Sequence, residues 1–198
     1  RYWATEAAYG RRRVAMLRGS EQEDFLRFEG NAQGFRIITR LQNPDNQGGL
    51  QLTCATLAAF TKYPRESWLG GNSYPGISAA KQGFVAADRT AFEAVAAATG
   101  LLRRHPNYAI WHRHPLAFLV EAADDISYLV IDIEDGFRLG YFSYDEVYEL
   151  FWPFLRGREG EAQRLARIRD PKNRIQFLRA KVINEAIRQA KECFLDHE

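Results

Sequence analysis

Most segments of the chain repeat their hydrophobic residues at the 3.6-residue period of an α-helix, and none sustains the two-residue alternation of a β-strand. This pattern predicts a mainly α fold with about six or seven helices. In the first half of the chain, the expected helices lie within residues 3–18, 21–30, 32–42, 50–61 and 89–100. A long apolar helix is expected to open at Pro115, because proline is favoured at the first position of a helix.

Capping residues mark the start of two further helices. Ser143 and Glu146 have the spacing of a capping box, in which each side chain accepts a hydrogen bond from the backbone N–H of the other residue. Asp170 precedes Pro171, which is the pattern of a cap followed by a first helical residue. The sequence therefore predicts one helix after Ser143 and a long amphipathic helix after Asp170.

The helical pattern is interrupted over residues 64–86. This stretch holds six proline and glycine residues, which are unfavourable inside helices. We expect a long irregular loop here that packs against a neighbouring element or caps a pocket, and does not link two domains.

Composition is that of a folded globular protein without a marked charge. Hydrophobic residues make up 46% of the 198 positions, enough for one large domain or a part of a longer protein. The net charge of +2 indicates no particular class of partner. No apolar run reaches the ~18–20 residues of a membrane span, so no membrane partner is expected. Cys54 and Cys193 lack the spacing of a metal site, and the expected location is a reducing cytoplasm.

Acidic residues lie inside the long apolar helix. Asp124, Tyr128 and Asp132 are four residues apart in turn, so they form one polar stripe along it. Three interpretations stay open at this point: a metal ligand, a substrate contact, or a structural stripe that pairs with arginine from a neighbouring helix. Asp125 and Glu134 point elsewhere, and we expect them to be solvated or ion-paired.

Three motifs together resemble one protein family. They are "FEGNAQGFRI" (28–37), "LAAFTKYPRE" (57–66) and "HPLAFLVEAADDISYLVIDIEDG" (114–136), with weaker similarity through "LRAKVINEAI" (178–187). In this order they are similar to the deoxyguanosine triphosphate triphosphohydrolases, which belong to the HD-domain metal-dependent phosphohydrolases. The resemblance implies a multi-helix HD-domain-like bundle, of which residues 1–198 form a single partial domain.

The resemblance also implies an activity, the hydrolysis of a deoxynucleoside triphosphate to the deoxynucleoside and tripolyphosphate. Asp124 matches a ligand of the family's metal ion, and a carboxylate suits Mg²⁺ or Mn²⁺. Tyr128 matches the tyrosine near the sugar, where it would leave no room for a 2′-hydroxyl group, and Asp132 matches the carboxylate that accepts a hydrogen bond from the 3′-hydroxyl group. Asn31 and Lys62 match positions that face the phosphates, where lysine supplies a compact positive charge.

The matched motifs leave the metal site incomplete. The family's other metal ligands, a histidine and a His-Asp pair, lie upstream of the first motif, and its acid or base residues follow that pair. This chain has no His-Asp pair. A catalytic site needs about three protein ligands. We therefore expect a fragment that is inactive alone, with its metal-binding half upstream of Arg1, a continuation after its last residue, and no catalytic residue that can be assigned.

The histidines of the chain do not fill this gap. None is four residues from another, and three of them precede the long apolar helix, where we interpret them as helix-cap or surface residues. The four histidines are His105, His112, His114 and His197.

A noncatalytic role is the alternative. Members of the family assemble into homo-oligomers and respond to nucleotides or single-stranded DNA, so the chain could be a binding or oligomerisation module of the same fold. The stretch "YGRRRVAMLR" (9–18) carries four arginines that could contact phosphates, although a solvated helix face has the same composition.

Overall fold

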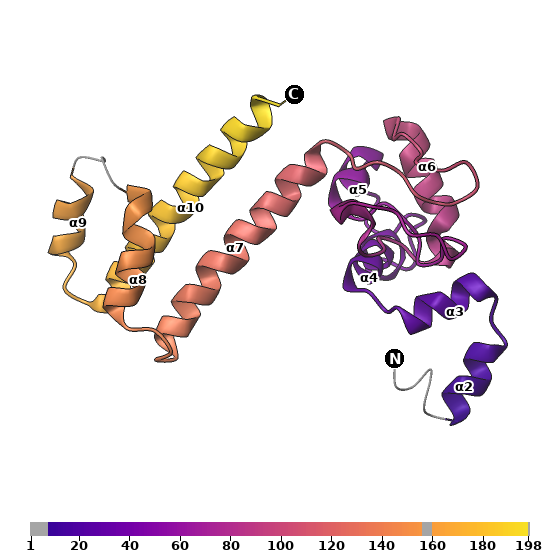
Figure 1. The fold of residues 1–198 in the computed structure, drawn as a ribbon, viewed down its shortest axis with the longest axis horizontal. Coiled ribbons are helices and arrows are strands. Elements are labelled where there is room, and N and C mark those ends of the chain that lie inside the picture. Colours follow the sequence, from indigo (N-terminus) through magenta and orange to yellow (C-terminus); the bar gives the residue numbers. More distant parts are fainter. Residues whose placement is uncertain (1–7, 156–159, 198) are drawn as a thin grey trace. The chain divides into compact units, whose positions relative to one another are not determined.

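The computed structural model describes residues 8–155 and 160–197 of the chain. Within these ranges the protein is mainly α, as predicted, and its extended segments form only isolated β-bridges. The chain divides into two compact units, which we call unit 1 (Arg1–Val120) and unit 2 (Glu121–Glu198). Figure 1 labels the helices of both units, which are described one at a time below. None of the helices in the described ranges is both long enough and apolar enough to cross a membrane.

Among the described residues of unit 1, five helices lie where the periodicity predicts them. They are α2 (Ala8–Ala15), α3 (Gly19–Leu26), α4 (Gly30–Arg36), α5 (Cys54–Phe60) and α6 (Arg89–Thr99). The predicted start of the first helix, in residues 3–7, lies outside the described residues. Helix α4 continues as a π-helical turn, η1 (Ile37–Leu41). Helix α5 begins later than predicted because Thr53 caps it, accepting a hydrogen bond from the N–H of Thr56.

Aromatic rings from four different segments form the core of unit 1. Phe35 comes from α4, Phe84 from the loop before α6, Phe92 from α6, and Trp111 from the segment before α7 (Leu116–Arg138). Phe84 and Phe92 stack with ring centroids 4.4 Å apart, and Trp111 packs on Phe92 at 5.3 Å. These buried contacts hold the irregular loop against the helices.

The segment 64–86 is irregular, as predicted, apart from a short 3₁₀ turn, η2 (Ile77–Ala79), within it. Arg65 binds three carbonyl groups within this segment. The guanidinium group of Arg65 donates to the carbonyl groups of Glu66, Ser67 and Ala79, each at 2.9 Å. These three residues are buried, so their carbonyl groups need donors, and Arg65 supplies them. Burial lowers the pKa of Arg65.

Three carboxylates in or near this segment bind neighbouring groups; Glu66 and Asp88 are buried, and Asp24 is half-buried. Glu66 is 1% exposed and pairs with Arg89 at the start of α6. Asp88 is also buried and pairs with Arg36 of α4 at 3.0 Å. Asp24 of α3 accepts hydrogen bonds from two residues of the segment. Because each carboxylate has a partner, its burial is compensated.

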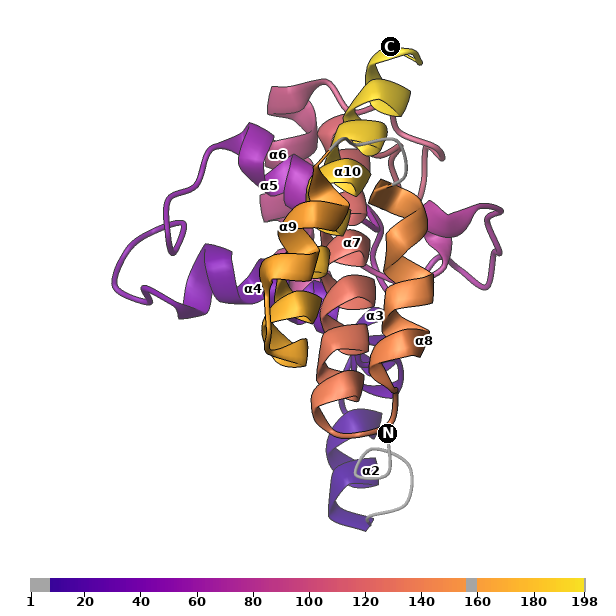
Figure 2. The same cartoon turned by 90° about the vertical axis from the view of Figure 1, so that its left-hand side faces the viewer.

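Unit 2 contains most of α7 together with α8 (Tyr144–Phe151), a 3₁₀ turn η4 (Trp152–Leu155), α9 (Glu161–Arg167) and α10 (Pro171–Leu195). Helices α7, α8 and α10 run side by side (Figure 2). The residues that form their common core are apolar and buried: Val130, Val147, Phe151, Leu155, Leu165, Ile175, Leu178 and Val182.

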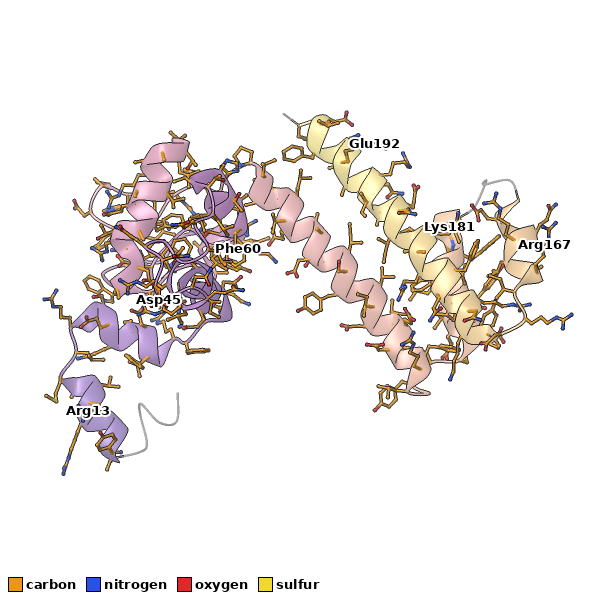
Figure 3. The ribbon with its side chains drawn as sticks, turned by 180° about the vertical axis from the view of Figure 1, so that it is seen from behind. Arg13, Asp45, Phe60, Arg167, Lys181 and Glu192 are labelled. Atoms are coloured by element: carbon orange, nitrogen blue, oxygen red, sulfur yellow. The ribbon has the colours of Figure 1, made fainter. Side chains whose placement is uncertain are left out.

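Both predicted caps of unit 2 are confirmed. Ser143 and Glu146 form the capping box of α8, and Asp170 accepts a hydrogen bond from the N–H of Lys172 at the start of α10. Helix α9 is not among the predicted helices. It is held by an ion pair, since Nζ of Lys181, labelled on α10 in Figure 3, lies 2.8 Å from Oε1 of Glu161.

Glu134 is ion-paired, as predicted, and it is also 2% exposed. Its carboxylate oxygens lie 2.5 Å from Nη1 of Arg179 on α10 and 2.6 Å from Nη2 of Arg138 on α7. The long helix thus pairs with an arginine of α10 through Glu134, which is not part of the acidic stripe. Asp125 is exposed, which fits the expectation that it is solvated.

Asp24 should make the stability of the chain depend on pH. Its carboxylate accepts hydrogen bonds from Oγ of Ser67 at 2.6 Å and from the N–H of Ala86 at 2.8 Å. Burial raises the pKa of Asp24 above its ordinary value of 3.8, and these two hydrogen bonds oppose that shift. A raised pKa in the folded state means that stability is lost as the pH rises from the unfolded-state pKa through the folded-state pKa.

We predict that Asp24→Asn becomes progressively more stable than wild type as the pH rises through this window, and that the difference then levels off. Asparagine keeps an acceptor for Ala86 and a donor for Ser67 but carries no charge. Thermal unfolding of both proteins from pH 3 to pH 7 measures the difference. Asp24→Ala, which loses both hydrogen bonds, should be less stable than Asp24→Asn throughout. A difference between Asp24→Asn and wild type that does not change with pH would contradict the assignment.

Gly83 allows the irregular segment to close on itself. Its N–H donates to the carbonyl of Arg65 at 2.9 Å, and an added Cβ would collide with the Tyr63 carbonyl oxygen and a methyl group of Thr61. We predict that Gly83→Ala lowers the free energy of unfolding by about 1–3 kcal/mol, measured by chemical denaturation. The matched control is Gly19→Ala at the start of α3, where an added Cβ meets no heavy atom within 4 Å. Equal effects of the two substitutions would be inconsistent with this packing.

Candidate functional site

The predicted stripe lies on α7 and is largely exposed. Asp124 is half-buried, Tyr128 is 65% exposed, and Asp132 is exposed. Asp132 forms no ion pair with any residue in the described ranges. A carboxylate beside an exposed phenol offers an acceptor and an apolar ring face to a ligand.

Lys62 lies directly after α5, beyond the C-cap residue Thr61. Figure 3 labels Phe60 at the end of this helix. The Lys62 side chain is half-buried, and its backbone carbonyl accepts a hydrogen bond from Nε of Arg113 at 2.7 Å. The position is therefore fixed through the backbone, while the ammonium group is the part that could reach a ligand.

Two cationic groups lie at the ring of Tyr63, the residue that follows Lys62. The guanidinium group of Arg113 lies 5.7 Å from the ring centroid, and Nζ of Lys81 lies 5.8 Å from it. Both distances are within the range of a cation–π interaction. Two cationic groups, those of Lys81 and Arg113, thus lie at the Tyr63 ring, next in sequence to Lys62, and we call these four residues the Tyr63 cluster. Such a group of charges suits a polyanion such as a triphosphate.

Asn31 occupies the first turn of α4. Its side-chain Nδ2 donates to Oε1 of Glu29 at 2.7 Å, and its backbone N–H donates to the same oxygen at 3.3 Å. Glu29 is the N-cap of the helix, so the cap also orients the Asn31 side chain. The amide oxygen of Asn31 is thereby left as an acceptor.

The five predicted site residues are divided between the two units. Asn31 and Lys62 belong to unit 1, and Asp124, Tyr128 and Asp132 belong to unit 2. Each group has its own local geometry, and the convergence of both groups on one nucleotide stays a prediction.

A metal ion does not fit the described residues alone. No group of three or more histidine, cysteine, aspartate or glutamate side chains in residues 8–155 and 160–197 is placed to hold one. Asp124 could supply one ligand of about three that a catalytic site requires.

The three histidines before α7 are surface or capping residues, as predicted. His112 is exposed, and Nδ1 of His114 accepts a hydrogen bond from the N–H of Leu116 at the start of α7. Nδ1 of His105 accepts one from the N–H of Asn107 in a turn.

Sequence reasoning missed two members of the Tyr63 cluster. Lys81 lies in the irregular segment, where no periodicity relates it to Lys62. Arg113 directly precedes the motif that begins at His114, and this position is the only sequence signal that could have drawn attention to it.

The arginines of α2 are exposed, as the nucleic-acid alternative requires. One of them is already engaged within the helix. The guanidinium group of Arg13 lies 5.3 Å from the ring centroid of Tyr9, and its Nε donates to the Tyr9 hydroxyl group at 3.1 Å. Contacts of this stretch with DNA stay a prediction.

No protein-family model matches the chain, but curated relatives do. A deoxyguanosinetriphosphate triphosphohydrolase-like protein of Synechocystis is 47% identical over 191 residues, which is 93% of this chain and 41% of the relative. Relatives with the same name are 35% identical over 200 residues in Pseudomonas aeruginosa and 39% identical over 130 residues in Listeria monocytogenes. The Pseudomonas match covers 100% of this chain and 44% of the relative, and the Listeria match covers 66% and 26%.

The chain spans less than half the length of these relatives. The similarity nevertheless runs along almost the whole chain, and it includes the Tyr63 cluster and the acidic stripe of α7. The chain belongs to the family of deoxyguanosinetriphosphate triphosphohydrolase-like proteins.

Proposed function

We propose that the whole protein to which this chain belongs hydrolyses a deoxynucleoside triphosphate to the deoxynucleoside and tripolyphosphate. The Tyr63 cluster is the observation that carries this proposal, because two cations lie at one ring next in sequence to Lys62, and such charges suit a triphosphate. The printed names of the relatives support the same reaction class.

In this proposal two sets of side chains contact different parts of the substrate. Lys62 and Asn31 contact the phosphates. Tyr128 packs against the sugar, and Asp132 accepts a hydrogen bond from the 3′-hydroxyl group. The exposed ring of Tyr128 and the exposed carboxylate of Asp132 support these roles, since both are accessible to a ligand.

Asp124 is proposed as one ligand of a divalent ion, Mg²⁺ or Mn²⁺. Its carboxylate is of the ligand type that these ions prefer. The remaining ligands would come from other parts of the whole protein, because the described residues contain no suitable group. For the same reason we propose that the 198-residue chain is inactive alone.

Homo-oligomer formation and a cytoplasmic location belong to the same proposal. The second candidate function is a noncatalytic module that binds nucleotides or single-stranded DNA, and the exposed arginines of α2 favour it. The two functions differ in salt dependence, because each phosphate contact along a DNA strand steepens the loss of affinity with salt.

The first prediction concerns the product. Whole protein incubated with Mn²⁺ and dGTP should release tripolyphosphate and deoxyguanosine in equal amounts, as measured by ion chromatography and nucleoside analysis. Asp124→Ala should abolish this release, because a metal ligand is lost, whereas Asp125→Ala on the exposed neighbour should retain it. Stepwise release of single phosphates would contradict the proposed reaction.

The second prediction concerns the sugar. Tyr128→Ala should raise kcat/KM for GTP relative to dGTP by about tenfold or more, because removal of the ring makes room for a 2′-hydroxyl group, and about 1.4 kcal/mol corresponds to tenfold. Turnover of dGTP should fall less than this ratio changes. Tyr141→Ala is the control, since Tyr141 is 77% exposed and lies beyond the end of α7. An unchanged ratio of kcat/KM values would remove Tyr128 from the sugar site.

A further inference from the structure

Two extended segments of unit 1 form a short antiparallel pairing next to Lys62. The N–H of Glu66 donates to the carbonyl of Ala109 at 3.1 Å, and the N–H of Trp111 donates to the carbonyl of Pro64 at 2.9 Å. These bonds flank an antiparallel bridge between Arg65 and Ile110. If this antiparallel register is continued from the Arg65–Ile110 bridge, Arg113 lies opposite Lys62.

At Arg113 the donor to the opposite strand is a side chain and not a backbone N–H. Nε of Arg113 donates to the Lys62 carbonyl at 2.7 Å, so the ladder ends with a side-chain hydrogen bond. The guanidinium group also lies between two rings, 5.7 Å from the centroid of Tyr63 and 5.5 Å from that of Phe118 in the first turn of α7. A planar guanidinium group can stack and donate at the same time, which an ammonium group cannot do equally well.

We propose that Arg113 is a positioning residue that holds Lys62 in place for its contact with the substrate phosphates. This inference rests on the proposed function, because it takes the phosphate role of Lys62 from there. Arg113 fixes the backbone of Lys62 through its hydrogen bond, and its stacking on Phe118 joins that backbone to the start of α7.

The chain contains a matched control. Nε of Arg103 donates to the carbonyl of Tyr108 at 3.2 Å, and its guanidinium group lies 5.1 Å from the ring centroid of Trp111. Arg103 therefore makes the same two kinds of contact as Arg113 within unit 1, but its hydrogen bond fixes the backbone of Tyr108 and not that of Lys62. A loss of stability common to the two variants can be separated in this way from an effect on Lys62.

The test is a double-mutant cycle on the whole protein, with kcat and KM for dGTP measured in the presence of Mn²⁺. Lys62→Met and Arg113→Ala should each raise KM by about tenfold, and the double variant should be little worse than either single variant, because both remove the same contact. Arg113→Lys should not restore KM, since lysine places a methylene group where Nε donates. In an Arg103→Ala background, Lys62→Met should keep its full effect.

Hydrogen exchange gives a readout that does not depend on activity. Peptides that cover residues 61–65 should exchange faster in Arg113→Ala than in wild type, and they should be unchanged in Arg103→Ala. Unchanged exchange in Arg113→Ala, or effects of Lys62→Met and Arg113→Ala that multiply in the double variant, would overturn the positioning role. A third outcome is faster exchange in Arg113→Ala together with a wild-type protein that releases no tripolyphosphate. It would show that Arg113 orders this segment and that the proposed reaction is wrong.

Discussion

A buried backbone polar group needs a hydrogen-bond partner, and this requirement shapes both ends of the segment 64–86 in unit 1. Residues 64–67 and 82–85 are mostly buried with little regular secondary structure, whereas most of the stretch between them is exposed. Arg65 supplies donors to three of its carbonyl groups, and the short pairing with residues 109–111 satisfies others. The segment can stay in place because these bonds are made, and Lys62 and Tyr63 are held at the end of it.

The long helix α7 has one face packed on the core of unit 2 and another face exposed. Val130 and Glu134 face the core of unit 2, where Glu134 is compensated by Arg138 and Arg179. Tyr128 and Asp132 lie on its exposed surface. A buried carboxylate without a partner would cost several kcal/mol, whereas an exposed one costs little and keeps its oxygens for a ligand. Acidic residues on this helix are therefore paired with arginine where they are buried and accessible to a ligand where they are exposed.

The sequence predicted the helix ends well where they depend on residues that are close together in the chain. The capping box of Ser143 and Glu146, the cap at Asp170 and the end of α6 at Gly100 depend on residues within one turn of each other, and all three are present. Helix α9 was missed because it is short and depends on the ion pair between Glu161 and Lys181, which are far apart in sequence.

The candidate site likewise contains residues that sequence motifs identify and residues that only the tertiary structure reveals. Lys62, Tyr128 and Asp132 were found through motifs, and the structure gives each a position from which it could bind a ligand. Lys81 and Arg113 could not be found by periodicity, because they meet the Tyr63 ring from an irregular segment and from the end of a short β-pairing. Contacts that arise from tertiary packing leave no regular spacing in the sequence.

The central claim is that the Tyr63 cluster and the acidic stripe of α7 bind the same nucleotide. A crystal structure of the whole protein with a nonhydrolysable dGTP analogue tests this claim most directly. The account predicts Nζ of Lys62 within about 3 Å of a phosphate oxygen, and Asp132 at a similar distance from the sugar 3′-hydroxyl group. A nucleotide bound with its phosphates away from Lys62, or with its sugar away from Tyr128 and Asp132, would contradict it.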